Sequence, residues 1–426
     1  MTKLITCGKY NNQYKFIWFL VISRLIFSYF FTYNTFAERY KPTFLKIEFP
    51  SSIFIKEFSE YIILFIGSFI FYQIEINQRA KISETSPSSL KGKKDTKLNL
   101  IYNKNRNIFR LPWTFYVSIL LFVLSSMLID HYYHISLQGL DFWELELIFI
   151  SFINMMIFKT QVYRHQKLAI YLIIISCSII KYIDIINIIK DDSEKKIYKE
   201  FIYLIPIALI GFILFIFLQS YAYCQAKYYF DYKYISVNKY LMWTGIIGGI
   251  ITFIGGFIAG FKECVPYSQY KYIKYICKIY DTDYNHKFYD SFKIFFKQLW
   301  KKKSTLISIE YIFLFILKNF NSFLTTYFTF LIIKNLSPEY FICANSIYYF
   351  ITSIFSVIDS ILSKKGVKQN TALSELLSIT GTAIYLEFIE LNFCELNHDL
   401  KDLIRKRSVS EITELSSFAE EIEDED

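Results

Sequence analysis

Charged side chains interrupt several otherwise apolar stretches of this chain. Arg24 lies near the middle of the first stretch, Glu310 and Lys318 share a later one, and Lys181 and Asp184 stand three residues apart. Inside a bilayer a charge is costly unless a partner, a bound ion or water satisfies it, so such residues are candidates for a solute path. Lys181 and Asp184 would share one helical face and could satisfy each other. Arg24 would need an anion, a cluster of carbonyl groups or a water-filled cavity.

Residues that could perform catalysis or bind a metal form no defensible set. All five histidines lie in predicted loops or at the ends of apolar stretches, so the buried histidine of a membrane acyltransferase is not expected; they are His131, His134, His165, His286 and His398. His131 and His134, with carboxylates nearby, are a weak metal signature. The chain has no Ser/His/Asp set, phosphate-binding loop or dinucleotide-binding glycine pattern. We therefore predict no enzyme, no cofactor and no metal.

The seven cysteines form no C-x-x-C pair, which argues against a zinc ribbon or a thioredoxin-like site. Cys264 and Cys277 fall in one long predicted loop. If that loop lies on an oxidising side of a membrane, the two could form a disulfide.

Long apolar runs must position these residues. Each run has close to the roughly 20 residues that an α-helix needs to cross a bilayer. The sequence therefore predicts an all-α polytopic membrane protein with about ten transmembrane helices, at residues 16–34, 58–76, 111–129, 143–158, 168–187, 201–222, 241–261, 305–333, 338–362 and 373–394.

Basic residues beside the runs predict the orientation. Loop 77–110 carries nine Lys or Arg against two acids, so it is expected to be cytosolic and, around its Ser-rich part, disordered. The next four loops obey the same rule by alternation. Loop 262–303 does not, because it carries ten Lys although alternation places it outside; a basic amphipathic helix lying on the membrane would explain this. The tail 396–426, with its acidic end, is expected inside, so both termini are predicted to be cytosolic.

The same rule accounts for the net charge of +9, and binding to nucleic acid is not expected. An even number of spans is compatible with two inverted five-helix repeats. We therefore divide the chain into a first transmembrane bundle, 1–200, and a second, 201–395.

Glycines gather in the seventh predicted span. Gly245 with Gly249, and Gly256 with Gly260, are GxxxG pairs on one helical face. Such faces allow a second helix to approach closely, so these four residues are predicted to pack helices. A smooth face that slides during transport is the alternative.

The segment LTTYFTFLIIKNLSPEYFICANSIYYFITSIFSVI, from Leu324 to Ile358, is predicted to form two helices joined by a tight Lys-Asn-Leu-Ser-Pro turn. It resembles the eighth and ninth helices of the drug/metabolite transporter superfamily, particularly its nucleotide-sugar carriers, in which a helix ends in a Lys at the position of Lys334. The ten-span layout and the glycine-rich seventh helix are also similar to that group. The resemblance implies a solute carrier.

We therefore predict a multi-pass carrier that moves a small organic, nucleotide-sugar-like anion by alternating access. Arg24, Lys318 and Lys334 would bind the anion, and the polar lining would be Asn154, Asn319, Asn321, Asn345 and Tyr348. The expected partners are the lipid bilayer and this solute, a homodimer is permitted, and the membrane is the plasma membrane or an endomembrane. The alternatives are a lipid scramblase, a non-transporting membrane scaffold and, more remotely, a metal-dependent membrane enzyme. The sequence names neither the solute nor a coupling ion.

Overall fold

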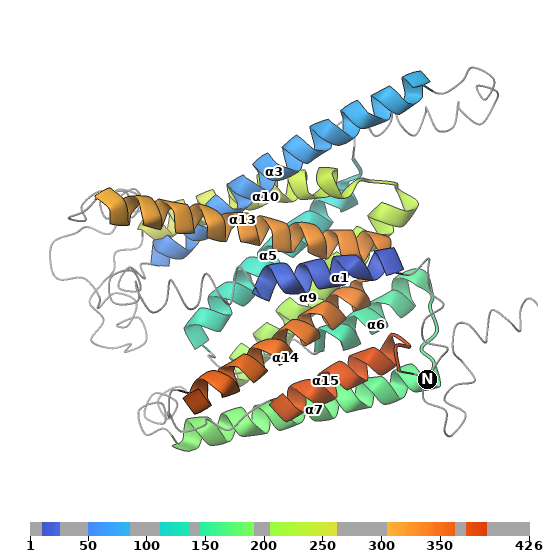
Figure 1. Cartoon of the computed structure of the whole chain (residues 1–426), viewed down its shortest axis with the longest axis vertical. Coiled ribbons are helices and arrows are strands. Elements are labelled where there is room, and N and C mark those ends of the chain that lie inside the picture. Colours follow the sequence, from blue (N-terminus) through green and yellow to red (C-terminus); the bar gives the residue numbers. More distant parts are fainter. Residues whose placement is uncertain are drawn as a thin grey trace, which may run out of the picture. The chain divides into compact units, whose positions relative to one another are not determined.

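The computed structural model describes residues 11–25, 50–85, 111–136, 145–190, 205–261, 305–362 and 372–389. All regular secondary structure among these residues is helical (Figure 1), which confirms the predicted all-α class. The ten helices are α1 (Asn11–Arg24), α3 (Pro50–Thr85), α5 (Trp113–Ser136), α6 (Leu145–Phe158), α7 (Arg164–Lys190), α9 (Ile205–Tyr232), α10 (Val237–Phe261), α13 (Thr305–Asn335), α14 (Pro338–Leu362) and α15 (Ala372–Tyr385).

Each predicted span overlaps one of these helices, but several ends differ by five to ten residues, and two of them bear on the predicted loops and tail. Helix α3 continues to Thr85, so the first residues of predicted loop 77–110 are helical. Helix α15 stops at Tyr385, nine residues before the predicted end of the tenth span. It stops because Glu387 takes a left-handed backbone conformation (φ 63°), and the amides of Glu387 and Phe388 bond back to the carbonyls of Ile384 (3.1 Å) and Ala383 (2.8 Å). This is the hydrogen-bond pattern of a Schellman motif, which ends helices.

The helices form two compact units that interleave along the chain. The first unit comprises Met1–Asp130 with Ala222–Phe341, and the second comprises His131–Tyr221 with Ile342–Asp426. The units interleave because helices far apart in the sequence pack together, α3 against α10 and α7 against α15. The division into two transmembrane bundles, 1–200 and 201–395, stays a prediction.

Aromatic rings form the core of the first unit. Phe330 lies at the centre of this cluster, with its ring centroid 5.0 Å from that of Tyr240 and 5.4 Å from that of Phe122. The cluster joins α5, α9, α10, α13 and the start of α14, and its remaining members are Phe115, Tyr223, Tyr229, Phe230 and Phe341. All eight side chains are buried. Edge-to-face rings add to the energy of apolar burial, so the high aromatic content of the chain has a structural use here.

Helices α3 and α10 pack antiparallel along their length. Contacts on α3 move toward its start as contacts on α10 move toward its end: Glu75 with Asn238, Phe65 with Gly245, Tyr61 with Gly248, and Phe58 with Phe253. Helix α13 packs on α3 in the parallel sense, because Ser59 meets Asn319 and Phe71 meets Tyr327.

Two glycines of α10 contact the neighbouring helix α3. At Gly245 a Cβ atom would lie 2.6 Å from the backbone nitrogen of Phe65, and at Gly248 it would overlap the Tyr61 ring. At Gly249 no atom of the described residues lies within 4 Å of the Cβ position. The described contact face therefore has i, i+3 spacing, and the packing role of Gly249 stays a prediction. Gly256 and Gly260 belong to α10, but their surroundings lie outside the described residues.

The predicted tight turn between the eighth and ninth helices is confirmed. Helix α13 ends at Asn335, and α14 begins at Pro338. Proline suits the first turn of a helix because that position has no intrahelical use for an amide hydrogen. Lys227 of α9 contacts the end of α13, where its Nζ donates a hydrogen bond to the Lys334 carbonyl (2.9 Å). The same ammonium group forms an ion pair with Asp231 (3.2 Å).

The second unit is organised around α7 and α15, which lie side by side and run antiparallel (Figure 1). A Cβ atom at Gly381 would lie 2.8 Å from Ile173, so the missing side chain lets the two helices approach. Helix α6 packs on α7, and Phe149 of α6 meets Phe217 of α9 edge-on.

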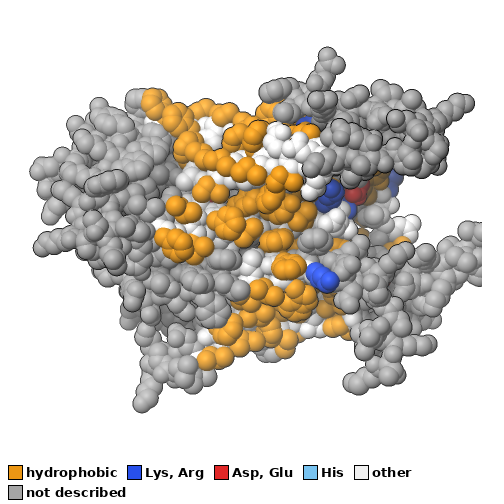
Figure 2. All heavy atoms as spheres, turned by 45° about the horizontal axis from the view of Figure 1, so that its top comes forward, with side chains coloured by type: hydrophobic (Ala, Val, Ile, Leu, Met, Phe, Trp, Pro, Cys, Tyr) orange, Lys and Arg blue, Asp and Glu red, His pale blue; other side chains and the backbone are white. Residues whose placement is uncertain are grey.

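Apolar side chains cover much of the described surface (Figure 2). Helices α3 and α10 expose a row each, including Ile70 (52%) and Ile254 (50%). By length and composition, Glu57–Gln78 and Val237–Gly255 are the two described segments that could cross a bilayer. They support association with a membrane, whereas the number of crossings stays a prediction.

Candidate functional site

A polar cavity of about 190 Å³ lies within the first unit, between helices that are otherwise apolar. Helix α3 supplies Glu57, Glu60, Tyr61 and Leu64, helix α5 supplies Phe122, Ser126 and Met127, and helix α13 supplies Ser322, Phe323 and Thr326. The described lining thus combines two carboxyl groups, hydroxyl groups and aromatic rings. Ligand sites commonly have this character, in which a few polar groups converge within apolar walls.

The two carboxyl groups stand one turn apart on α3, so both face the same side of the helix. Glu57 is only 5% exposed, and Glu60 is half-buried. Ser322 of α13 donates to Glu60 Oε2 at 3.0 Å, which fixes the position of that carboxyl group. A buried acid in such a helix is costly, and residues of this kind are functional candidates.

Asn319 and Asn321, which we predicted as solute contacts, directly precede the cavity-lining residues of α13 in the sequence. Neither of them is part of the described lining. Asn319 is 1% exposed and accepts a hydrogen bond from the Ser59 hydroxyl at 3.1 Å. This bond and the Ser322–Glu60 bond tie α13 to α3 on the side that carries the two carboxyl groups.

The described residues do not bring the other predicted contacts to this cavity. Arg24 is the last residue of α1 and Lys318 lies in α13, but both side chains fall outside the described residues. Lys334 lies in the last turn of α13, where Lys227 caps its carbonyl. The remaining three belong to the second unit: Asn154 on α6, Asn345 on α14 and Tyr348 on α14, whose ring meets that of Tyr349 edge-on.

Cys264 and Cys277, the predicted disulfide pair, lie outside the described residues. The described cysteines Cys177, Cys224 and Cys343 are buried thiols. Within the same part of the chain, no group of three or more potential metal ligands occurs.

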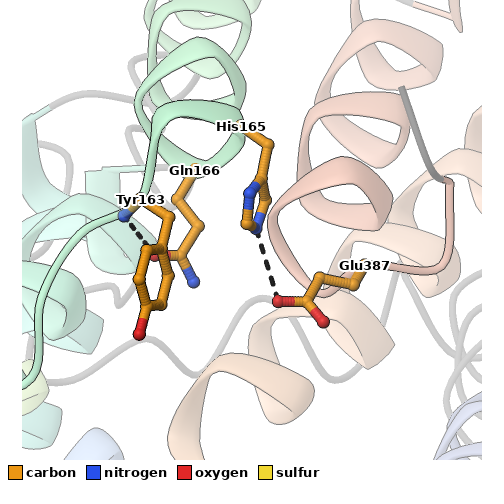
Figure 3. A network of polar contacts seen from close by, with 4 residues as sticks. All are labelled: Tyr163, His165, Gln166 and Glu387. Carbon is orange, nitrogen blue, oxygen red and sulfur yellow. Dashed lines mark hydrogen bonds and ion pairs between the residues drawn. The ribbon is translucent and has the colours of Figure 1, made fainter. Parts of the chain in front are cut away.

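A second polar group lies at one end of the second unit (Figure 3). His165, in the first turn of α7, is 2% exposed, and its Nε2 lies 3.4 Å from Glu387 Oε1 beyond the end of α15. The ring of Tyr163 stacks on the imidazole (centroids 6.0 Å apart), and the Gln166 amide oxygen accepts the Tyr163 backbone amide at 3.0 Å. That last bond is half of a capping box, which explains why α7 begins here.

His165 corrects one sequence-based prediction. We placed His165 in the loop KTQVYRHQK, before the fifth predicted span, whereas it belongs to the first turn of α7 and is buried. The side chain is buried because the chain reverses at Glu387 and returns a carboxylate to it. The pair ties α7 to α15, and when His165 is protonated it is an ion pair.

The sequence did contain a signal for the cavity. Glu60 lies inside the second predicted span and Glu57 directly before it, so an inventory of charges within spans leads to both. Glu75 and Glu146 are likewise acidic residues inside predicted spans. Lys239 is different: it is 2% exposed at the start of α10, which no local pattern indicates.

The fold and the site together define a helical protein with membrane-length apolar helices and an internal polar cavity. No family model matches the chain, and no curated protein matches it either. The resemblance to the drug/metabolite transporter superfamily therefore stays a prediction.

Proposed function

We propose that this chain is a ten-span membrane carrier that moves a small organic solute through a cavity in its helical core. The cavity between α3, α5 and α13 is the observation that carries the proposal. Carboxyl and hydroxyl groups are costly to bury inside an apolar bundle, and a carrier needs such groups to replace water around its solute.

Helix directions support repeated crossing of a membrane. In an alternating topology, helices whose order in the chain differs by an odd number run antiparallel. The second and seventh helices, α3 and α10, do so, and so do the fifth and tenth, α7 and α15. The second and eighth, α3 and α13, run parallel, as an even difference requires.

Helix partners also support two inverted five-helix repeats. A two-fold repeat would exchange each helix with the one five places later, so contacts should come in exchanged pairs, and several of the described ones do. The contact of α1 with α13, through Phe19 and Phe328, exchanges with that of α9 with α5, through Tyr229 and Thr114. The contact of α3 with α13 exchanges with that of α10 with α5, through Trp243 and Tyr116. The pairs α3–α10 and α7–α15 exchange with themselves.

The exposed apolar side chains fit the same proposal. Leu120, Leu124, Ile250 and Phe253 are all at least one-third exposed, although they lie at the middle of apolar helices. In water such surfaces favour association, but in a bilayer they face lipid tails.

A transport assay tests the function. The full chain is reconstituted into proteoliposomes and offered a panel of labelled organic amines, carboxylates and nucleotide sugars. We expect uptake of at least one class above that of protein-free vesicles. Ser126→Phe should abolish it by filling the cavity, whereas Leu124→Phe, two residues away on the lipid side of α5, should leave it unchanged.

Two results contradict the proposal. Uptake that survives Ser126→Phe would place the path elsewhere. Transfer of fluorescent phospholipid between leaflets, without uptake of any offered solute, would instead establish the lipid scramblase that we named as the alternative.

A further inference from the structure

The described lining of the cavity carries acidic side chains and no basic ones. Its described residues include Glu57 and Glu60 but no Lys or Arg, and Lys334 lies at the far end of α13. An anion entering this cavity would meet two carboxyl groups. The anionic solute expected from Arg24, Lys318 and Lys334 therefore finds no support in the described lining.

Aromatic rings stand beside the carboxyl groups. Tyr61 lies one residue after Glu60 on α3, and Phe122 and Phe323 line the cavity from α5 and α13. The faces of aromatic rings attract cations, and rings on several sides of a site are the usual means of binding an alkylated ammonium group. Carboxyl groups combined with rings thus match an organic cation better than a bare metal ion, which needs several oxygen ligands at short range.

The cavity has room for a small solute. Its volume is about 190 Å³ and it is partly open, so a small amine fits within it. The Ser126, Ser322 and Thr326 hydroxyls provide further hydrogen-bond partners around it.

We propose that the cavity binds a small organic cation whose ammonium group sits between the Glu57 and Glu60 carboxyl groups and the rings of Tyr61, Phe122 and Phe323. This inference deepens the proposed carrier function by naming the class of its solute, and it rests on that function for its biological meaning. Binding itself can be measured without transport.

The experiment measures thermal unfolding of the full-length protein in detergent during titration with tetramethylammonium chloride. Sodium chloride and sodium acetate serve as comparisons at equal ionic strength. Tetramethylammonium should raise the melting temperature of the wild type, and neither comparison salt should do so. Glu57→Gln and Glu60→Gln should weaken the apparent affinity for tetramethylammonium by about tenfold or more, because each removes one charge from the site.

Glu75→Gln is the matched control. Glu75 lies on the same helix and accepts a hydrogen bond from Asn238 at 2.9 Å, but it does not line the cavity. Its variant should keep the wild-type affinity even if its own melting temperature falls. Should a glutamate variant fail to fold, Ser126→Phe closes the cavity without changing either carboxyl group and should also lose the response.

The inference is overturned if tetramethylammonium does not stabilise the wild type, if sodium or acetate stabilises it equally, or if the glutamate variants and Ser126→Phe keep full affinity. Uptake of anionic solutes alone would overturn this inference and leave the carrier function standing. Glutamate-dependent binding of tetramethylammonium without transport of any solute would support this inference and contradict the carrier function.

Discussion

At the scale of single residues, three described non-glycine residues, Lys159, Tyr234 and Glu387, take a left-handed backbone conformation just after a helix, and the first and last of them differ in what compensates for the strain. Lys159 follows α6 with φ 54° and is exposed. Glu387 follows α15 with φ 63°, and its carboxylate meets buried His165. Glycine is the usual residue at such positions because it has no Cβ to clash with the backbone. Glu387 compensates for its strain through a contact that glycine could not make, whereas no such contact of Lys159 is described.

We therefore expect Lys159→Gly to stabilise the protein by about 0.5–1 kcal/mol, because it relieves the left-handed strain. Glu387→Gly should bring no gain, because it also removes the partner of His165. Thermal unfolding in detergent measures both. Thr160→Gly, at an exposed position with ordinary φ, is the control and should not stabilise; equal gains for Lys159→Gly and Thr160→Gly would show that strain at Lys159 is not the cause.

At the scale of elements, one face of α10 decides how closely it approaches α3. Gly245 faces the α3 backbone and Gly248 faces the ring of Tyr61, while no atom of the described residues lies within 4 Å of the Cβ position at Gly249. The contact has i, i+3 spacing because of the direction in which α10 crosses α3. The positions of the glycines in the sequence do not specify that direction.

Gly245→Ala should accordingly destabilise the protein by about 1–3 kcal/mol, because its Cβ would push against backbone that cannot rotate away. Gly249→Ala should be neutral or stabilise by up to about 1 kcal/mol, since alanine favours helix and meets no described neighbour. Melting temperatures of the two purified variants test the pair. A larger loss for Gly249→Ala than for Gly245→Ala would contradict the observed face.

At the scale of the whole molecule, the proposed alternation of ten helices makes a prediction about sidedness. Tags at Lys94 and after Asp426 should both be cytosolic, and a tag at Gln138 should lie on the opposite side. Protease protection of tagged protein in sealed membranes measures this. If Lys94 and the tail lie on different sides, an even number of spans is wrong, and with it the pairing of helices five places apart.

The sequence alone determined where the helices lie and that they are apolar. Runs of Phe, Ile and Leu act locally, so the positions of ten helices and the turn before Pro338 follow from neighbouring residues. It also indicated that glycines in α10 pack against another helix, which Gly245 does.

Only the tertiary structure decided which residues meet. In helices that are apolar all around, no amphipathic pattern marks the inner face, so the choice between Gly248 and Gly249 was not readable. The same holds for Glu57 and Glu60, which become a site only because α5 and α13 enclose them. His165 looked like a loop residue and is buried by a carboxylate 222 positions away in the chain. Local sequence determines helices because their hydrogen bonds close within four residues, whereas a cavity depends on contacts between distant segments.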